Sequence, residues 1–182
     1  MNKELLKTLP TSWNELTLSQ YNKLITANLI PSEENDDEVV NDFDINLMVI
    51  ATLTDTHIDD LEALSFNEIL PAIANISFLY TPLEPVKSNL KCKDISELSY
   101  ADFVQYMQLQ GDPFNNVNQI LPIFFDELKD IDLNEKPISE IVFFLIVLQK
   151  KLLKHLKRSQ AFLIKKILKQ KVMNLFKRKE QA

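Results

Sequence analysis

Few residues in this chain have the type and spacing that acid–base catalysis or metal binding requires. His57 is followed by Asp59 and Asp60, and an imidazole beside carboxylates could act as a general acid or base. The other histidine, His155, lies 98 residues further along, whereas a zinc site needs several His or Cys ligands at close spacing. We favour the interpretation that Asp59 and Asp60 occupy the first turn of a helix, where the helix dipole favours acids. The sequence therefore predicts that the protein is not an enzyme and has no metal, cofactor or small-molecule substrate.

Other features that often mark a site are missing or incomplete. Gly111 is the only glycine, which argues against the glycine-rich loops that bind nucleotides. The acidic stretch at 31–44 lacks the alternating oxygen ligands and central glycine of a calcium loop, so we interpret it as a polar loop. Cys92 is the only cysteine, which excludes an internal disulfide and favours a reducing compartment.

Charge is divided unevenly along the chain. Residues 150–182 hold 12 of the 20 basic residues and one acid, Glu180, whereas residues 1–149 hold 8 basic and 25 acidic residues. This division indicates either a basic arm that binds an anionic partner or a tail that docks on the acidic body of a neighbouring copy in a homo-oligomer. A solvated polar helix face explains it equally well.

The basic segment ends the longest uninterrupted helical pattern, which begins at Ile138. The apolar run at 141–148 predicts a buried core helix. Beyond it, apolar residues recur at helical spacing among lysines, which predicts a basic amphipathic helix. Three uses compete for this helix: packing on the protein itself or another copy, docking in a partner's groove, or binding an anionic membrane or nucleic acid. The residues that would contact a partner are Leu156, Phe162, Leu163, Ile164, Lys165, Lys166, Ile167, Leu168 and Lys169.

A helix-start pattern recurs three times. It is a Ser or Thr followed three residues later by Gln, Glu or Asp, as in a capping box, and it occurs at Thr17–Gln20, Ser65–Glu68 and Ser99–Asp102. The third copy is the weakest because Asp is shorter than Glu or Gln. A fourth start has Pro137, a residue favoured in the first turn. The eight prolines, standing between apolar segments, predict helices joined by short loops.

The fold class that these patterns predict is all-α, a small irregular helical bundle with a long basic amphipathic C-terminal helix. We divide the chain into a capped-helix bundle at 1–80, a proline-containing linker loop at 81–94, rear helices that complete the core at 95–149, and the basic helical extension at 150–182. The predicted helices are Leu18–Leu29, Ile45–Leu53, Asp59–Leu64, Phe66–Leu79, Tyr100–Gln110, Val117–Lys129 and Ile138–Arg178.

Residues 43–80 show a familiar order of parts: an apolar helix ending in a Leu-Thr pair, a short acidic turn-helix, a Ser cap and a helix closing on aromatics. These parts are Leu53 with Thr54, residues 58–64, Ser65, and Phe78 with Tyr80. This order resembles the tail assembly chaperones of tailed bacteriophages, and the SWNELTLSQYNKL segment from Ser12 resembles the start of the same proteins. Asp55 replaces the glycine usual in that family, and the resemblance covers only the front 80 residues or so.

The resemblance implies a protein that binds the tape measure protein or tail tube subunits during phage tail assembly and keeps their apolar surfaces from aggregating. It brings no cofactor or catalytic residue, and it implies a location in the host cell cytoplasm. Two alternatives belong to other classes. One is a structural virion protein of the tail, connector or internal capsid, located in the virion; the other is a peripheral nucleic-acid- or membrane-binding factor that uses the basic C-terminal helix.

Overall fold

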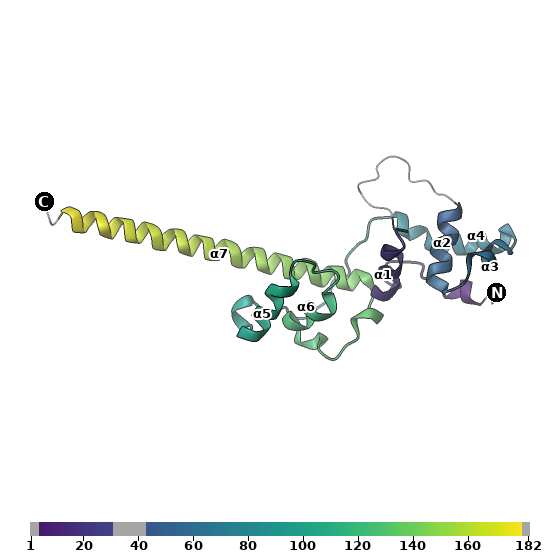
Figure 1. Ribbon diagram of the computed structural model, residues 1–182, viewed down its shortest axis with the longest axis horizontal. Helices are drawn as coiled ribbons and strands as arrows, with labels where there is room; N and C mark the ends of the chain where they lie inside the picture. Colours follow the sequence, from purple (N-terminus) through teal and green to yellow (C-terminus); the bar gives the residue numbers. More distant parts are fainter. Residues whose placement is uncertain (1–3, 31–42, 180–182) are drawn as a thin grey trace. The chain divides into compact units, whose positions relative to one another are not determined.

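The all-α fold class predicted from the sequence is confirmed. The computed structural model describes residues 4–30 and 43–179, with side chains as far as Arg158 in the last helix. These residues form seven α-helices and no β-strand (Figure 1). The α-helices are α1 Leu18–Thr26, α2 Phe43–Thr54, α3 Ile58–Glu62, α4 Phe66–Ile76, α5 Tyr100–Leu109, α6 Val117–Phe124 and α7 Ile138–Lys179. Five short 3-10 segments accompany them: η1 Leu5–Thr8, η2 Ser77–Tyr80, η3 Ile95–Glu97, η4 Asp126–Leu128 and η5 Leu133–Glu135.

Two of the three predicted capping boxes are confirmed in full. At the start of α1, the Gln20 backbone N–H donates to Thr17 Oγ1 at 3.2 Å, and the Thr17 N–H donates to Gln20 Oε1 at 3.0 Å. The start of α4 has the same reciprocal pair, in which the Ser65 N–H donates to Glu68 Oε2 at 2.9 Å. Local side chains therefore satisfy the free backbone donors at both helix starts.

The start of α5 has only half of this arrangement. The Asp102 N–H donates to Ser99 Oγ at 3.1 Å, but the Asp102 carboxylate accepts from the Ser99 hydroxyl at 2.8 Å and not from its N–H. Aspartate is one carbon shorter than glutamate, as the weaker pattern predicted. The predicted start of the last helix at Ile138 is confirmed, and Pro137 stands immediately before the helix rather than in its first turn.

Left-handed residues end α1 and α2. Asn28 has a φ of 55° and Asp55 a φ of 51°, a region that glycine usually occupies. In both cases the backbone N–H of the next residue donates to the carbonyl five positions earlier. After α1, this bond runs from the Leu29 N–H to the Leu24 carbonyl at 2.9 Å. The helix predicted to end at Leu29 therefore ends at Thr26. In a chain with one glycine, Asn and Asp provide these helix ends.

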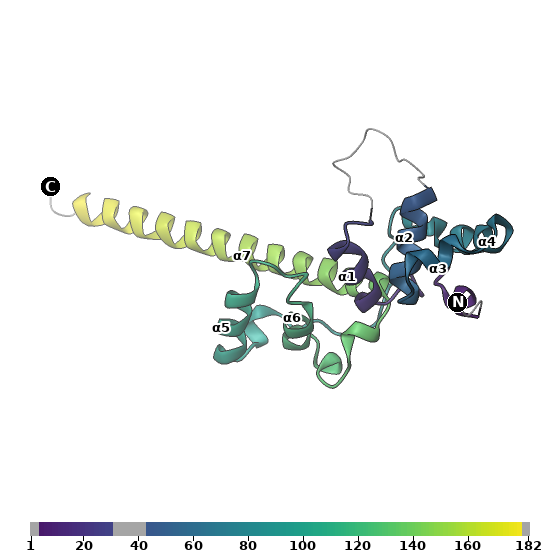
Figure 2. The same cartoon turned by 45° about the vertical axis from the view of Figure 1, so that its right-hand side comes forward.

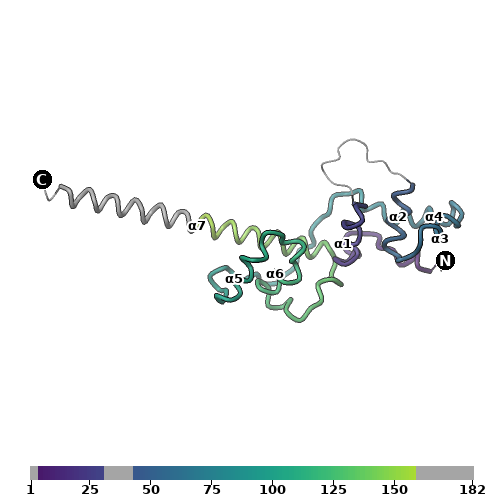
Figure 3. The backbone as a smooth tube through the Cα atoms, in the orientation of Figure 1, coloured from purple at the N-terminus to yellow at the C-terminus, as the bar shows by residue number. Residues whose placement is uncertain are grey.

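The chain folds into two compact units. The first comprises residues 1–89 and 130–144, and the second comprises residues 90–129 and 145–182 (Figure 3). This grouping places residues 130–144 with the front helices, whereas the sequence analysis assigned them to the rear ones. Helix α7 belongs to the first unit at its start and to the second unit from Leu145.

The first unit joins the starts of α1 and α7 through paired backbone hydrogen bonds. The Leu18 N–H donates to the Lys136 carbonyl, and the Ile138 N–H donates to the Leu16 carbonyl, both at 2.9 Å. In this unit, α2 packs against α1, α3 and α4 (Figure 2). Its buried apolar residues include Leu16, Leu18, Leu24, Val49, Ile50, Leu61, Ile69, Ile76, Ile138, Ile141 and Phe144.

Trp13 packs against two aromatic rings in the first unit. Its ring meets the Tyr21 ring edge-on with centroids 6.4 Å apart, and it meets the Phe78 ring at 5.2 Å. The indole N–H donates to the Thr81 carbonyl at 3.2 Å. Trp13 therefore ties the segment before α1 to η2 and the residue that follows it.

The second unit packs α5 against α6. The Tyr106 and Phe124 rings meet edge-on with centroids 5.1 Å apart, and Phe124 is 1% exposed. The Lys93 N–H donates to the Phe124 carbonyl at 2.8 Å, which attaches the segment before α5 to the end of α6. The buried apolar residues here include Cys92, Tyr106, Val117, Ile120, Leu121, Ile123, Phe124, Phe125 and Leu128.

Two sequence predictions about helices are wrong. The run at 141–148 is not buried all round, because Ile141, Phe144 and Leu148 are buried while its other five residues are only half-buried. Spacings of three and four residues place the three buried side chains on one side of α7, so only that side is fully covered. Not every proline stands between helices either, since Pro71 lies inside α4 and Pro122 inside α6.

Candidate partner-binding surface

Helix α7 presents an exposed basic and apolar surface where the sequence predicts partner binding. Lys150, Leu153, Lys154, Lys157 and Arg158 line one shallow, open depression on it. Positions three, four and seven apart share one helix face, so these side chains lie together. We call these five residues together with Leu156 the α7 surface. Leu153 is 49% exposed and Leu156 is 55% exposed, so the surface contains apolar area that the described residues leave uncovered.

The opposite side of α7 is attached to the second unit. Leu148 is 3% exposed, and the Lys151 ammonium donates to the Cys92 carbonyl and lies 3.4 Å from Asp94 Oδ1. Asp94 in turn caps η3 in a capping box with Glu97. Because Lys151 is engaged on this side, the lysines at 150, 154 and 157 point to other faces of the helix.

A second ion cluster fixes the segment that carries Cys92. Asp126 Oδ1 lies 2.6 Å from the Lys129 ammonium and 2.7 Å from the Lys93 ammonium. Hydrogen bonds from Lys129 and Lys93 hold the pKa of the Asp126 carboxyl below its usual value. The carboxylate is thus charged at neutral pH and joins the segment before α5 to the segment after α6.

Cys92 is a buried structural residue. Its side chain is 4% exposed, and burial raises the pKa of the thiol to about 11, although the nearby Lys151 charge acts in the opposite direction. The thiolate is the reactive form of cysteine. The geometry therefore gives Cys92 a packing role.

We expect thiol reagents to label native Cys92 at pH 8 about 100-fold more slowly than the unfolded chain, because a pKa about two units higher lowers the thiolate fraction about 100-fold. Since the folded pKa is the higher one, the neutral thiol contributes to stability below pH 9 and this contribution is lost as the pH rises toward about 11. Labelling with a chromogenic disulfide, with and without guanidinium, measures the ratio. Equal rates in the two states would contradict the burial.

The predicted acid–base cluster is a surface feature of α3. His57 precedes the helix, and Asp59 and Asp60 lie in its first turn, as the simpler interpretation predicted. His57 Nδ1 is 3.4 Å from Asp59 Oδ2, and both side chains are 79% exposed. Both side chains therefore face water rather than an enclosed site.

A polar depression in the first unit also lacks the residues that catalysis or metal binding would need. Its lining residues are Ser19, Asn22, Lys23, Thr26, Ala27, Thr52, Asp55 and Asn134. The Lys23 ammonium lies 2.8 Å from Asp55 Oδ1, so the two side chains pair α1 with the residue after α2. This pair neutralises the two charged groups of the depression.

No protein-family model, curated protein or solved structure matches this chain.

Within residues 4–30 and 43–158, no three His, Cys, Asp or Glu side chains group as metal ligands. Among those same residues, no helix has the length and apolar character to cross a membrane. The acidic stretch at 31–44 is predicted to be a polar loop, and its residues 31–42 lie outside the described residues.

The structure describes one residue of the predicted partner-binding set, Leu156, and it is exposed. Phe162, Leu163, Ile164, Lys165, Lys166, Ile167, Leu168 and Lys169 have side chains outside the described residues.

Sequence reasoning missed Leu153 and a pair of aromatic residues in the first unit. Leu153 is 49% exposed, yet it is not in the predicted partner-binding set. Phe43 and Phe66 are the first residues of α2 and α4, and their rings stack with centroids 5.8 Å apart. A bulky aromatic as the first residue of a helix is the signal that could have drawn attention to both.

Proposed function

We propose that the protein is a non-catalytic assembly factor that binds a helical segment of another protein through the α7 surface. The observation that carries this proposal is the exposure of Leu153 and Leu156, at 49% and 55%, beside the exposed cationic side chains of Lys150, Lys154, Lys157 and Arg158. Adjacent exposed leucines offer apolar area to a partner, while lysines around them keep the surface hydrated. An amphipathic helix of this kind binds partners by laying its apolar stripe against another apolar face.

For the identity of the partner, we propose a phage tail component, either the tape measure protein or the tail tube subunit. The resemblance of residues 43–80 to tail assembly chaperones supports this choice. The one departure in that segment keeps its backbone geometry, because Asp55 adopts the left-handed φ of 51° that suits the glycine of that family. On this proposal the protein acts in the host cytoplasm and leaves before the particle is complete.

The test is co-expression of the full chain with the tail tube and tape measure proteins of the same genome, followed by affinity capture. Each leucine buried in an interface contributes about 1.5–3 kcal/mol. We therefore expect Leu153→Ser with Leu156→Ser to reduce capture at least about tenfold. Met107→Ser is the matched control, because Met107 is 48% exposed on α5 of the same unit. Undiminished capture by the double variant would contradict the proposed surface.

Mass spectrometry of purified infectious particles distinguishes the assembly factor from a structural virion protein. Absence from particles, together with capture of tail proteins from infected cells, supports the assembly role. Stoichiometric presence in particles would make the protein a structural component.

The lysines of the α7 surface favour a second candidate, binding to nucleic acid or an anionic membrane. Affinity for such a partner falls steeply with salt, because each neutralised phosphate releases counterions. Binding to an apolar helix depends much less on salt. A steep loss of partner capture between about 0.05 and 0.2 M salt would favour the second candidate.

A further inference from the structure

The first unit carries an exposed aromatic surface. The Phe43 and Phe66 rings stack with centroids 5.8 Å apart and planes inclined at 30°. Although they contact each other, Phe43 is 40% exposed and Phe66 is 61% exposed. Leu70, one turn after Phe66 on α4, is 43% exposed. Three large apolar side chains on two packed helices thus remain accessible to a partner.

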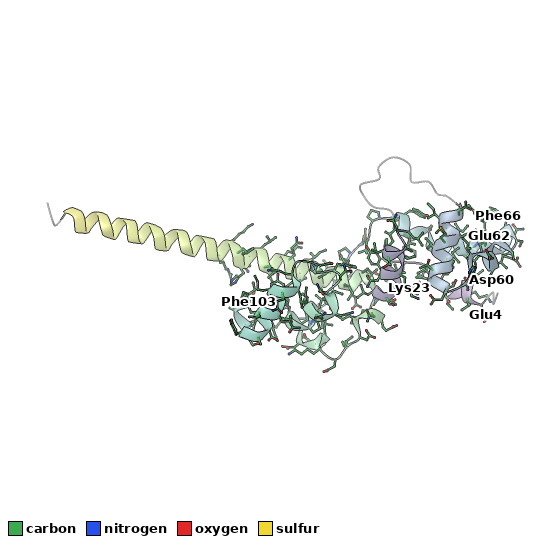
Figure 4. All side chains as sticks on the ribbon, in the orientation of Figure 1. Glu4, Lys23, Asp60, Glu62, Phe66 and Phe103 are labelled. Carbon is green, nitrogen blue, oxygen red and sulfur yellow. The ribbon has the colours of Figure 1, made fainter. Side chains whose placement is uncertain are left out.

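Acidic side chains lie at the same end of the first unit as Phe66 (Figure 4). These are Asp60 and Glu62, which are exposed on α3. Between Lys23 and Lys87 the sequence has no Lys or Arg. No ion pair involves Asp60 or Glu62 within the described residues. We call Phe43, Phe66, Leu70, Asp60 and Glu62 the acidic aromatic patch, and its field selects a cationic partner.

The same chain contains a partner of that chemistry. The α7 surface has two exposed leucines flanked by Lys150, Lys154 and Lys157. It begins the segment at 150–182, which holds 12 basic residues and one acid. Leucines suit the aromatic rings, lysines suit Asp60 and Glu62, and a cation over a phenylalanine ring adds about 0.5–2 kcal/mol.

We propose that the acidic aromatic patch of one copy binds the α7 surface of a second copy. The two surfaces differ, so the contact is heterologous, and each copy offers one surface of each kind. A dimer forms if two copies exchange both contacts, and a chain of copies forms if they do not. This proposal does not depend on the assembly role, because it needs no other protein.

Sedimentation velocity of the full chain over a wide concentration range tests the proposal. At about 0.1 M salt we expect the mean mass to rise above the monomer's 21.1 kDa with concentration. It should return toward the monomer at about 1 M salt, because the screening length falls from about 10 Å to about 3 Å. The proposal would be overturned if the protein were a monomer at every concentration. A monomer in which the two surfaces bind each other within one copy would count as the same result.

Single-surface variants locate the contact. We expect Phe66→Ser to weaken association at least about tenfold, because aromatic residues at the centre of an interface carry much of its affinity. Ile25→Ser is the matched control, since Ile25 is 49% exposed on α1 of the same unit. Thermal unfolding by circular dichroism checks that both variants fold. Equal weakening by the two variants, or none by Phe66→Ser, would contradict the patch.

A charge exchange between two variants is the sharpest test. One variant carries Asp60→Lys and Glu62→Lys, and the other carries Lys150→Glu, Lys154→Glu and Lys157→Glu. Each alone should be monomeric, because its two surfaces then have the same sign of charge. When the two variants are mixed, they should associate. The basic α7 surface of the first variant meets the acidic aromatic patch of the second, and the lysine-bearing patch of the first meets the glutamate-bearing α7 surface of the second. A mixture that stays monomeric would overturn the proposal.

Discussion

Phe124→Ala is expected to lower the free energy of unfolding by about 3–5 kcal/mol. Phe124 is 1% exposed in α6 and meets the Tyr106 ring edge-on at 5.1 Å. Removing the ring loses its transfer free energy and leaves a cavity that α5 and α6 can only partly fill. The edge-on aromatic contact, worth about 0.5–1.5 kcal/mol in addition, is also lost. Urea unfolding followed by far-ultraviolet circular dichroism measures the change.

The matched control for this variant is Gln119→Ala in the same helix. Gln119 is exposed, so its replacement should change the free energy of unfolding by less than about 0.5 kcal/mol. A loss below about 1 kcal/mol for Phe124→Ala would show that its ring is not enclosed by the second unit.

Ile50→Ala is the corresponding variant in the first unit, with an expected loss of about 2–5 kcal/mol. Ile50 is 0% exposed in α2, the helix that packs against α1, α3 and α4. Its truncation therefore removes apolar contacts at the centre of the first unit. Met48→Ala is the control, because Met48 lies on the same helix and is 45% exposed. Similar losses for the two variants would contradict the burial of Ile50.

Together the two core variants report on cooperativity. Ile50 belongs to the first unit and Phe124 to the second. If the units unfold separately, each variant shifts one of two calorimetric transitions; if they unfold together, both variants shift the same transition. The calorimetric trace of the wild-type protein, with one transition or two, decides which of these two results to expect.

The starts of helices could be predicted from the sequence because their causes are local. Thr17 with Gln20, and Ser65 with Glu68, satisfy backbone donors only a few residues away, so their spacing in the sequence is nearly sufficient. The ends were predicted less well. The helix at Leu18 stops three residues earlier than expected, because Asn28 takes a left-handed conformation that its residue type allows but does not require.

The candidate site was predicted only in outline. Helical spacing identified the basic amphipathic segment and Leu156, which is exposed. It did not identify Leu153, because the side of α7 that lies against the second unit is set by Leu148 and by the contacts of Lys151. A period of 3.6 residues defines faces of a helix but not which face is covered.

The sequence by itself determined the helical class, three helix starts and the separation of an acidic body from a basic C-terminal segment. These properties follow from local hydrogen bonding, residue periodicity and charge counts. Only the tertiary structure decided that the run at 141–148 is most deeply buried on one side, and that Phe43 and Phe66, 23 residues apart, stack on each other while both stay exposed. Burial and stacking depend on which distant segments pack together, and that is a property of the whole chain's apolar surface and not of any local pattern.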